Sequence, residues 1–439
     1  MGHNYPVLII IIFLSIFSRF MLLKSQETTD NLPEAKGAYY TNEYEDLFIS
    51  LLGMGDMDVN EKVNDAFTQL FYGDDSTQRF YYPAGNEMAF IKDILHNDVR
   101  SEGMSYGMMI AVQLNRQEEF NRLWKWAKEF MQHKSGTRKN YFAWQCRTDG
   151  TIIDPNPASD GEEWFVMALM LAANRWGNGE GIYNYQKEAQ SVLDAMLNKT
   201  ADSDKRDVVT NMFNKDTKVV VFVPTGFADD FTDPSYILPH FYELWALWAD
   251  KNNQFWKEAA AAGRNLLKAN VNAQTGLASD YAGFDGLPGN APWGGNQQDF
   301  RYDAWRVAMN VAIDYEWFGK DNWAIEESNR LLKFFYAQGI NKYGNLFTLD
   351  GRVLSNDHRA GLVAMNAAAA LAANIPERKA FVEALWNLRI PDGIERYYDG
   401  MLYMLAMLQV SGHFNIYHPA EAQLDGNKKL QRNLKTFDK

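Results

Sequence analysis

The sequence predicts an all-α fold, an (α/α)6 toroid of six inner and six outer helices with long loops gathered at one face. Apolar residues recur at three- and four-residue steps over most of the chain beyond residue 40, which is the period of a helix. No comparable run of alternating apolar and polar residues appears, so extended sheets are not expected. The predicted helices alternate between strongly apolar and amphipathic, as two concentric layers require.

The helical period is clear enough to assign each element in chain order. Helices are expected over residues 40–54, 59–72, 102–114, 118–131, 160–176, 186–197, 234–248, 254–267, 303–318, 323–337, 359–373, 376–388 and 398–410. The best strand candidate is the short β-branched run at 219–223, which we place in a loop hairpin.

Two kinds of helix define the predicted layers. The segments opening at 102, 160, 234, 303, 359 and 398 are rich in Ala, Met, Gly and aromatic residues, as in GLVAMNAAAALAA from Gly361 to Ala373. We expect these six to be buried on nearly all sides and to form the inner ring. The segments between them carry one charged face, as in QEEFNRLWKWAKEFMQ from Gln117, and form the outer ring.

Composition and charge restrict the partners of the folded chain. Of 439 residues, 46% are hydrophobic, which is enough for one large core. A formal net charge of -13 disfavours nucleic acid and anionic membrane surfaces, so a neutral ligand is expected. Cys146 is the only cysteine, which excludes an intrachain disulfide and a thiolate metal cluster. We expect no cofactor, no required metal and a monomer.

The N-terminus resembles a signal peptide. An apolar run from Val7 to Phe17 is too short to span a bilayer comfortably, and Arg19 and Lys24 follow it. We predict a signal peptide over residues 1–25 and export to the periplasm or outside the cell, with an uncleaved anchor as the alternative. Residues 26–38 are expected to be a flexible lead-in, and residues 39–439 a single domain.

Five acidic residues open predicted inner-ring helices: Glu102, Asp160, Asp233, Asp303 and Asp399. Any one of them is explained by helix capping, and Asp233 and Asp399 stay open between that role and a place in a site. Five together predict a ring of carboxylates suited to acid/base chemistry on a neutral substrate. The long aromatic loops at 132–159 and 270–298 would wall this active-site face, so the arrangement favours a carbohydrate chain and glycosidic hydrolysis.

Three motifs resemble those of glycoside hydrolase family 8. They read SEGMSYGM from Ser101, ASDGEEWFVMALMLA from Ala158 and RYDAWR from Arg301. The second departs from the usual family signature, which has Asp where this chain has Glu162. The resemblance extends by helix order over about 90% of the chain from residue 40 onward, and it implies a helical toroid and hydrolysis with inversion of configuration.

The resemblance also implies roles for four residues of these motifs. Glu102 would be the general acid, Asp303 the general base, Asp160 a sugar-binding group at the point of cleavage, and Arg306 a neighbour of the substrate. An inverting pair sits roughly 6.5 to 9.5 Å apart to leave room for the attacking water. Glu102 must stay protonated near neutrality, which partial desolvation among other carboxylates would favour.

Other segments resemble the xylan-active branch of the family. In TDPSYILPHFYELWA from Thr232, Tyr236 matches a tyrosine that helps hold the attacking water. Tyr398 would contact a sugar, and Trp144 would be a stacking platform. His358 falls where members that release xylose from the reducing end place a histidine against the terminal hydroxyl. Its neighbours Asp357 and Arg359 differ from the Leu and Pro expected there.

The predicted function is therefore that of an inverting glycoside hydrolase that cleaves β-1,4-xylosidic bonds and releases xylose from the reducing end of xylo-oligosaccharides. An endo-1,4-β-xylanase of the same family is the alternative. A cellulase or chitosanase of the family and a noncatalytic glycan-binding protein stay open. Polysaccharide lyases, sugar epimerases and terpene cyclases also use helical toroids. Lyases favour Tyr, His or Arg around uronic acids, which fits this carboxylate-rich ring poorly, and epimerases of this shape rely on paired histidines, whereas the seven histidines here are scattered.

Overall fold

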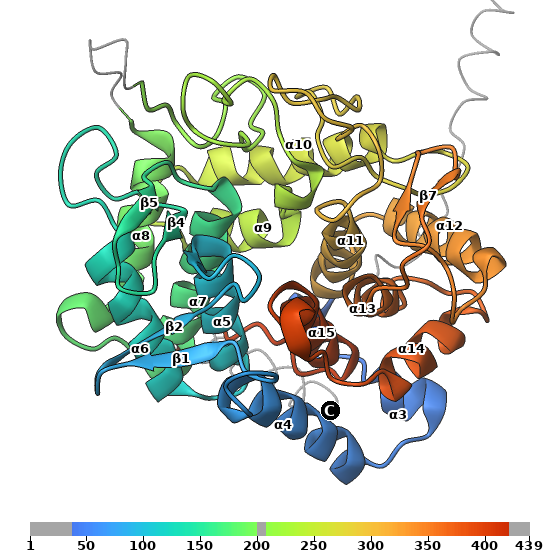
Figure 1. The fold of residues 1–439 in the computed structure, drawn as a ribbon. Coiled ribbons are helices and arrows are strands. Elements are labelled where there is room, and N and C mark those ends of the chain that lie inside the picture. The colour runs from blue at the N-terminus through green and yellow to red at the C-terminus, as the bar shows by residue number, and fades with distance from the viewer. Residues whose placement is uncertain (1–36, 200–207, 421–439) are drawn as a thin grey trace, which may run out of the picture. The chain divides into compact units, whose positions relative to one another are not determined.

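The computed structural model describes residues 37–199 and 208–420, which belong to one compact unit. Its main helices alternate along the chain between an inner and an outer layer (Figure 1). The inner helices are α5 (Ser101–Gln113), α7 (Ser159–Trp176), α9 (Pro239–Trp248), α11 (Trp305–Phe318), α13 (Ala360–Ala369) and α15 (Tyr398–Val410). The outer helices are α4 (Asp56–Tyr72), α6 (Gln117–Trp126), α8 (Tyr185–Leu197), α10 (Asn253–Asn270), α12 (Trp323–Gln338) and α14 (Arg378–Asn387). The predicted (α/α)6 toroid is confirmed.

The inner helices pack against one another in chain order, and α15 returns to α5. Between α7 and α9 the contact is made by the rings of Trp164 and Phe241, whose centroids lie 4.9 Å apart. Gly161 allows α7 to approach α5 closely, because a Cβ at this position would lie 2.4 Å from Ser101 Oγ. The ring of inner helices is therefore closed.

Burial follows the predicted division into two layers. Every residue from Gly361 to Ala373 is buried, and so is every residue from Asp399 to Val410. The outer helix α6 instead buries Phe120, Leu123 and Trp124 and exposes Glu118 in its first turn. A helix that is apolar all round requires neighbours on every side, which only the inner positions provide.

Short strands join the loops that precede the inner helices. They are β1 (Tyr81–Ala84), β2 (Met88–Ile91), β3 (Val99–Arg100), β4 (Gln145–Cys146), β5 (Ile152–Asp154), β6 (Leu346–Phe347) and β7 (Val353–Ser355). Strands β3, β4 and β5 form an antiparallel sheet in which Arg100 lies opposite Gln145. None of them was predicted, since two to four residues are too few to show a period of two.

The structure corrects three other expectations of secondary structure. The helix expected over 40–54 is two short helices, α2 (Ala38–Thr41) and α3 (Leu47–Leu52), because Asn42 adopts a φ of 58° and the Asp46 side chain caps Ile49 N–H. The run at 219–223 forms no strand and makes a single bridge from Val220 to Phe213. The helix expected from 234 begins as a 3-10 turn, Pro234–Tyr236, and α9 starts at Pro239.

Among the described residues, no helix combines the length and the apolar composition needed to cross a membrane. The predicted signal peptide at 1–25 and most of the predicted lead-in lie outside the described residues.

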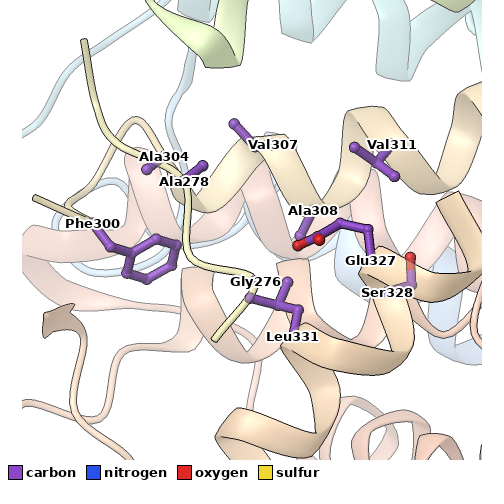
Figure 2. Close-up of a pocket in the computed structure, with 10 residues that line it drawn as sticks. All are labelled: Gly276, Ala278, Phe300, Ala304, Val307, Ala308, Val311, Glu327, Ser328 and Leu331. Carbon is purple, nitrogen blue, oxygen red and sulfur yellow. The ribbon is translucent and has the colours of Figure 1, made fainter. Parts of the chain in front are cut away.

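A small pocket of about 10 Å³ lies between α11, α12 and the loop at Gly276 (Figure 2). Glu327 of α12 turns its carboxyl group toward Ala308 of α11, and most of the remaining lining is apolar. Glu327 Oε2 pairs with Arg330, whereas Glu327 Oε1 has no hydrogen-bond partner among the described residues. Burial raises the pKa of Glu327 to about 8, against the opposing charge of Arg330.

Candidate active site

Arg306, on the first turn of α11, is the centre of the candidate site. Its Nη1 donates to Asp160 Oδ2 at 2.8 Å and to Tyr106 Oη at 2.6 Å. Its Nη2 donates to Asp303 Oδ1, also at 2.8 Å. The Tyr236 ring lies beside the guanidinium, 5.6 Å from Cζ to the ring centroid. One buried cation therefore joins residues of α5, α7, α11 and the turn before α9.

Glu102 lies in the first turn of α5, directly after strand β3. It is partly exposed, and Ser101 Oγ donates to its Oε2 at 3.3 Å. Burial raises the pKa of Glu102 to about 8, and the negative charge of Asp160 adds to the rise, while Arg100 and Arg306 oppose it. A carboxyl group with this pKa holds a proton near neutrality, as a general acid must.

Asp303 was expected at the start of a helix but lies in the turn before α11, which begins at Trp305. The turn is held by Asp280, whose Oδ1 accepts a hydrogen bond from Ala304 N–H at 3.0 Å. The Asp303 side chain is 36% exposed and pairs with Arg306. Asp303 is therefore accessible, whereas the nearby carboxyl groups of Asp160, Asp233 and Asp280 are buried.

Two further carboxyl groups lie close to Asp303. Asp233 caps the turn before α9, accepting from Ser235 N–H at 2.7 Å, and it also interacts with the charge of Asp303, so the cap lies within the site. Burial and the charge of Asp303 together raise the pKa values of Asp233 and Asp280 well above those of ordinary aspartates. Asp280 was not predicted, because its position in a long loop gives no sign that it meets α11.

Asp399, the last of the five acidic helix-opening residues, makes no side-chain cap. Its Oδ2 accepts from Arg359 Nε at 3.1 Å, and Arg359 also pairs with Glu395. This ion-pair group ties the start of α13 to the start of α15. Its member Arg359 faces the cavity described next.

A cavity of about 480 Å³ opens beside Asp303. Its lining combines charged, aromatic and apolar side chains, namely Asp93, Leu95, His96, Arg100, Tyr302, Asp303, Arg359, Ile394, Glu395, Tyr397 and Tyr398. Glu102 itself does not line it, but its neighbours Arg100 and Tyr397 do. Arg100 pairs with Asp93 and Asp98 at 3.2 Å each. Asp93, Leu95, His96 and Ile394 were missed because their loops carry no motif, whereas Tyr302 lies within RYDAWR but was given no role.

Three other predicted site residues, Tyr398, Trp144 and His358, differ in how closely they are connected to the cavity. Tyr398 lines the cavity and donates from its hydroxyl to the Tyr302 carbonyl at 2.6 Å. Trp144 is half-buried and lies under the Arg100 guanidinium, 5.3 Å from the ring centroid. His358 is exposed, and its Nδ1 lies 2.9 Å from the Tyr343 carbonyl. The structure thus groups Glu102, Asp160, Tyr236, Asp303, Arg306 and Tyr398, and leaves Trp144 and His358 at the edge.

The arrangement places a carboxyl group with a raised pKa, Glu102, near an accessible carboxyl group that is paired with an arginine, Asp303. No group of three or more His, Cys, Asp and Glu side chains is placed to hold a metal ion within residues 37–199 and 208–420. The site therefore offers a proton donor, a carboxylate held by a buried arginine, and aromatic side chains around a cavity large enough for a small sugar.

Comparison with known proteins places the whole described unit in one family. The profile of Glycosyl hydrolases family 8 matches residues 93–412. The chain is 43% identical over 385 residues to the reducing-end xylose-releasing exo-oligoxylanase Rex8A of Paenibacillus barcinonensis, covering 87% of this chain and 99% of that protein. It is 41% identical to a reducing end xylose-releasing exo-oligoxylanase of Halalkalibacterium halodurans, covering 88% of this chain and 97% of that one.

A solved structure gives the same result. The catalytic mutant of a GH8 xylanase from Teredinibacter turnerae, in complex with xylohexaose, is 44% identical and superimposes with a TM-score of 0.85. The match covers 87% of this chain and all of that one. The chain therefore belongs to glycosyl hydrolases family 8 and is a glycoside hydrolase.

Proposed function

We propose that this protein cleaves β-1,4-xylosidic bonds with inversion of configuration and releases xylose from the reducing end of xylo-oligosaccharides. Glu102 is the general acid and Asp303 the general base. The observation that carries this proposal is the different environment of the two carboxyl groups. Glu102 is kept protonated by burial and by the charge of Asp160, whereas Asp303 is paired with Arg306 and open to solvent.

The proposed reaction uses these two environments. Glu102 gives its proton to the glycosidic oxygen as the bond from that oxygen to the anomeric carbon breaks. Asp303 takes a proton from a water molecule whose oxygen bonds to the anomeric carbon from the opposite face. Cleavage leaves Glu102 deprotonated and Asp303 protonated, and exchange of one proton with solvent restores both. Arg306 stabilises the Asp303 carboxylate until the water is deprotonated.

The remaining predicted residues bind the sugar. Asp160, held in place by Arg306, accepts hydrogen bonds from the sugar at the point of cleavage through Oδ1, which is buried and without a hydrogen-bond partner among the described residues. Tyr236 helps position the attacking water, and Tyr398 contacts a sugar in the cavity. Trp144 provides a stacking surface.

Release from the reducing end is supported by the two relatives named for that activity and by the position of His358. His358 directly precedes Arg359, which lines the cavity beside Asp303. In this proposal His358 meets the terminal hydroxyl of the sugar on the leaving side. Export through a signal peptide at residues 1–25, ahead of a single catalytic domain at 39–439, would bring the enzyme to its substrate outside the cytoplasm.

An endo-1,4-β-xylanase is the second candidate. The similarity to the Teredinibacter turnerae xylanase bound to xylohexaose and the exposure of His358 favour it. In addition, Asp357 and Arg359 stand where the exo-acting pattern predicts Leu and Pro. An open cleft would cut polymeric xylan internally.

Product analysis over time distinguishes the candidates. Xylotriose and xylotetraose labelled at the reducing end should first yield labelled xylose. Early labelled xylobiose, with rapid cleavage of polymeric xylan, would establish the endo-acting alternative. No cleavage would leave a cellulase, a chitosanase or a glycan-binding protein as the candidates. Glu102→Ala and Asp303→Ala should each abolish turnover while leaving substrate binding largely intact.

A further inference from the structure

A group of aromatic side chains leads from the candidate site to the surface. We name Phe222, Phe227, Phe231, Tyr281 and Trp293 the aromatic strip. They come from two loops, at 222–231 and 281–293, that precede the inner helices α9 and α11. All five are described, and none belongs to the cavity beside Asp303.

The strip begins at the site itself. Tyr236, which lies beside Arg306, stacks on Phe222 with a centroid distance of 5.7 Å and an interplanar angle of 15°. Phe222 in turn contacts Tyr281 at 4.6 Å and Trp293 at 6.1 Å. The path from Arg306 to Trp293 is therefore a continuous series of ring contacts.

The outer end of the strip is exposed. Phe227 and Trp293 are each 54% accessible, and their ring centroids lie 6.3 Å apart. A single exposed aromatic residue is ordinary on a protein surface, but two in contact form an apolar patch that requires another explanation. Trp293 is also held against Phe231 at 5.9 Å, so its ring is positioned before any ligand arrives.

The inner members of the strip are structural. Phe231 is 8% exposed and forms a small core under the loops with Ala228 and Ala291. This core fixes the two loops but gives no reason for Phe227 and Trp293 to remain in water. Their exposure is explained if a ligand covers them.

We propose that Phe227 and Trp293 form a distal subsite that binds the non-reducing end of a long xylo-oligosaccharide whose reducing end lies in the cavity beside Asp303. The proposal rests on the proposed function. Arg359, next to His358, lines that cavity, so the leaving-side sugar is assigned there. The strip reaches Arg306 through Tyr236, from other segments of the chain, and is therefore assigned to the opposite end of the substrate. The apolar face of a sugar ring packs on an aromatic ring, which suits this surface.

The test is the dependence of kcat/KM on substrate length, from xylotriose to xylohexaose. For Trp293→Ala combined with Phe227→Ala, we expect kcat/KM on xylohexaose to fall on the order of tenfold. The value on xylotriose should stay unchanged, because a short chain does not reach the strip. Trp293→Phe keeps a flat face and should retain most of the rate on xylohexaose. Tyr336→Ala removes another exposed aromatic ring, on α12, and should have no effect at any length.

Two outcomes would overturn the distal subsite alone. The first is an unchanged length dependence in the double variant, and the second is an equal loss at every length, which would mean that the strip only supports the site. Thermal unfolding of each variant identifies any loss due to misfolding, in which case Trp293→Phe and Phe227→Ala are compared separately. Absence of xylo-oligosaccharide hydrolysis by the unmodified protein would overturn the proposed function and the subsite together.

Discussion

The carboxylates of Asp160 and Asp303 are held by a single guanidinium, because Arg306 donates to one through Nη1 and to the other through Nη2, each at 2.8 Å. Asp160 is almost completely buried, whereas the Asp303 side chain is 36% exposed. The same cation therefore fixes one buried and one accessible carboxyl group, which we propose to contact the sugar and the attacking water, respectively. A planar fork of donors is needed to reach both.

Replacing this fork by a point charge is the first prediction. Arg306→Lys should lower kcat by roughly a hundredfold to a thousandfold, because one ammonium cannot hold Asp160, Asp303 and Tyr106 in place together. Steady-state kinetics on xylotriose measures the loss. Arg264→Lys is the matched control, since Arg264 also pairs with two carboxylates, Glu243 and Asp314, but outside the site. It should lower stability and leave kcat unchanged; equal kinetic losses in both variants would contradict the prediction.

The second prediction concerns the alkaline limit of activity. Glu102 must be protonated, so kcat/KM should decline as the pH rises through its pKa of about 8. Asp160→Asn removes a negative charge that raises the pKa of Glu102, so the decline of kcat/KM on the alkaline side should begin at lower pH. Glu162→Gln is the control, because Glu162 is a buried carboxyl group two residues along α7 whose pKa burial raises well above its ordinary value. If the alkaline decline of kcat/KM in Asp160→Asn stays at the same pH or moves to higher pH, Glu102 is not the group whose protonation limits activity.

Much of the fold could be predicted from the sequence because periodicity is a local property. All six inner helices were located, since segments such as 361–373 are apolar on every face and can only be buried. The split of 40–54 into α2 and α3 was missed because its apolar spacing is helical. The left-handed Asn42 and the cap by Asp46 nevertheless interrupt it.

The site was predicted only in part for the opposite reason. Glu102, Asp160, Asp303 and Arg306 lie in motifs on predicted helices, so their segments could be assigned. Asp280 reaches the backbone of Ala304 across 24 residues, and no local pattern announces such a contact. The pairing of β3 with β4, which sets Trp144 beside Ser101, likewise depends on two-residue strands.

The third prediction addresses the leaving side of the substrate. Arg359 faces the cavity and is fixed by Glu395 and Asp399, so Arg359→Ala should widen the cavity and admit a second sugar. Labelled xylotetraose should then yield labelled xylobiose in addition to xylose, with the ratio measured by chromatography. Arg378→Ala is the control, because Arg378 binds carbonyl groups near the end of α13, away from the cavity. An unchanged ratio of labelled xylobiose to labelled xylose in Arg359→Ala would show that Arg359 does not determine the length of the product.

The fourth prediction concerns stability and uses Glu327 in the small pocket of Figure 2. Burial raises the pKa of Glu327 from 4.5 to about 8, so between these two values the folded protein holds a proton that the unfolded chain has released. Stability therefore falls as the pH rises through this window. Glu327→Gln cannot lose that proton, so its gain in Tm over the unmodified protein should be small near pH 5 and grow to a maximum above about pH 8. Calorimetry across this range measures the difference, with Glu326→Gln, an exposed neighbour on α12, as the control. A difference in Tm that is the same at every pH would show that Glu327 titrates alike in the folded and unfolded chain.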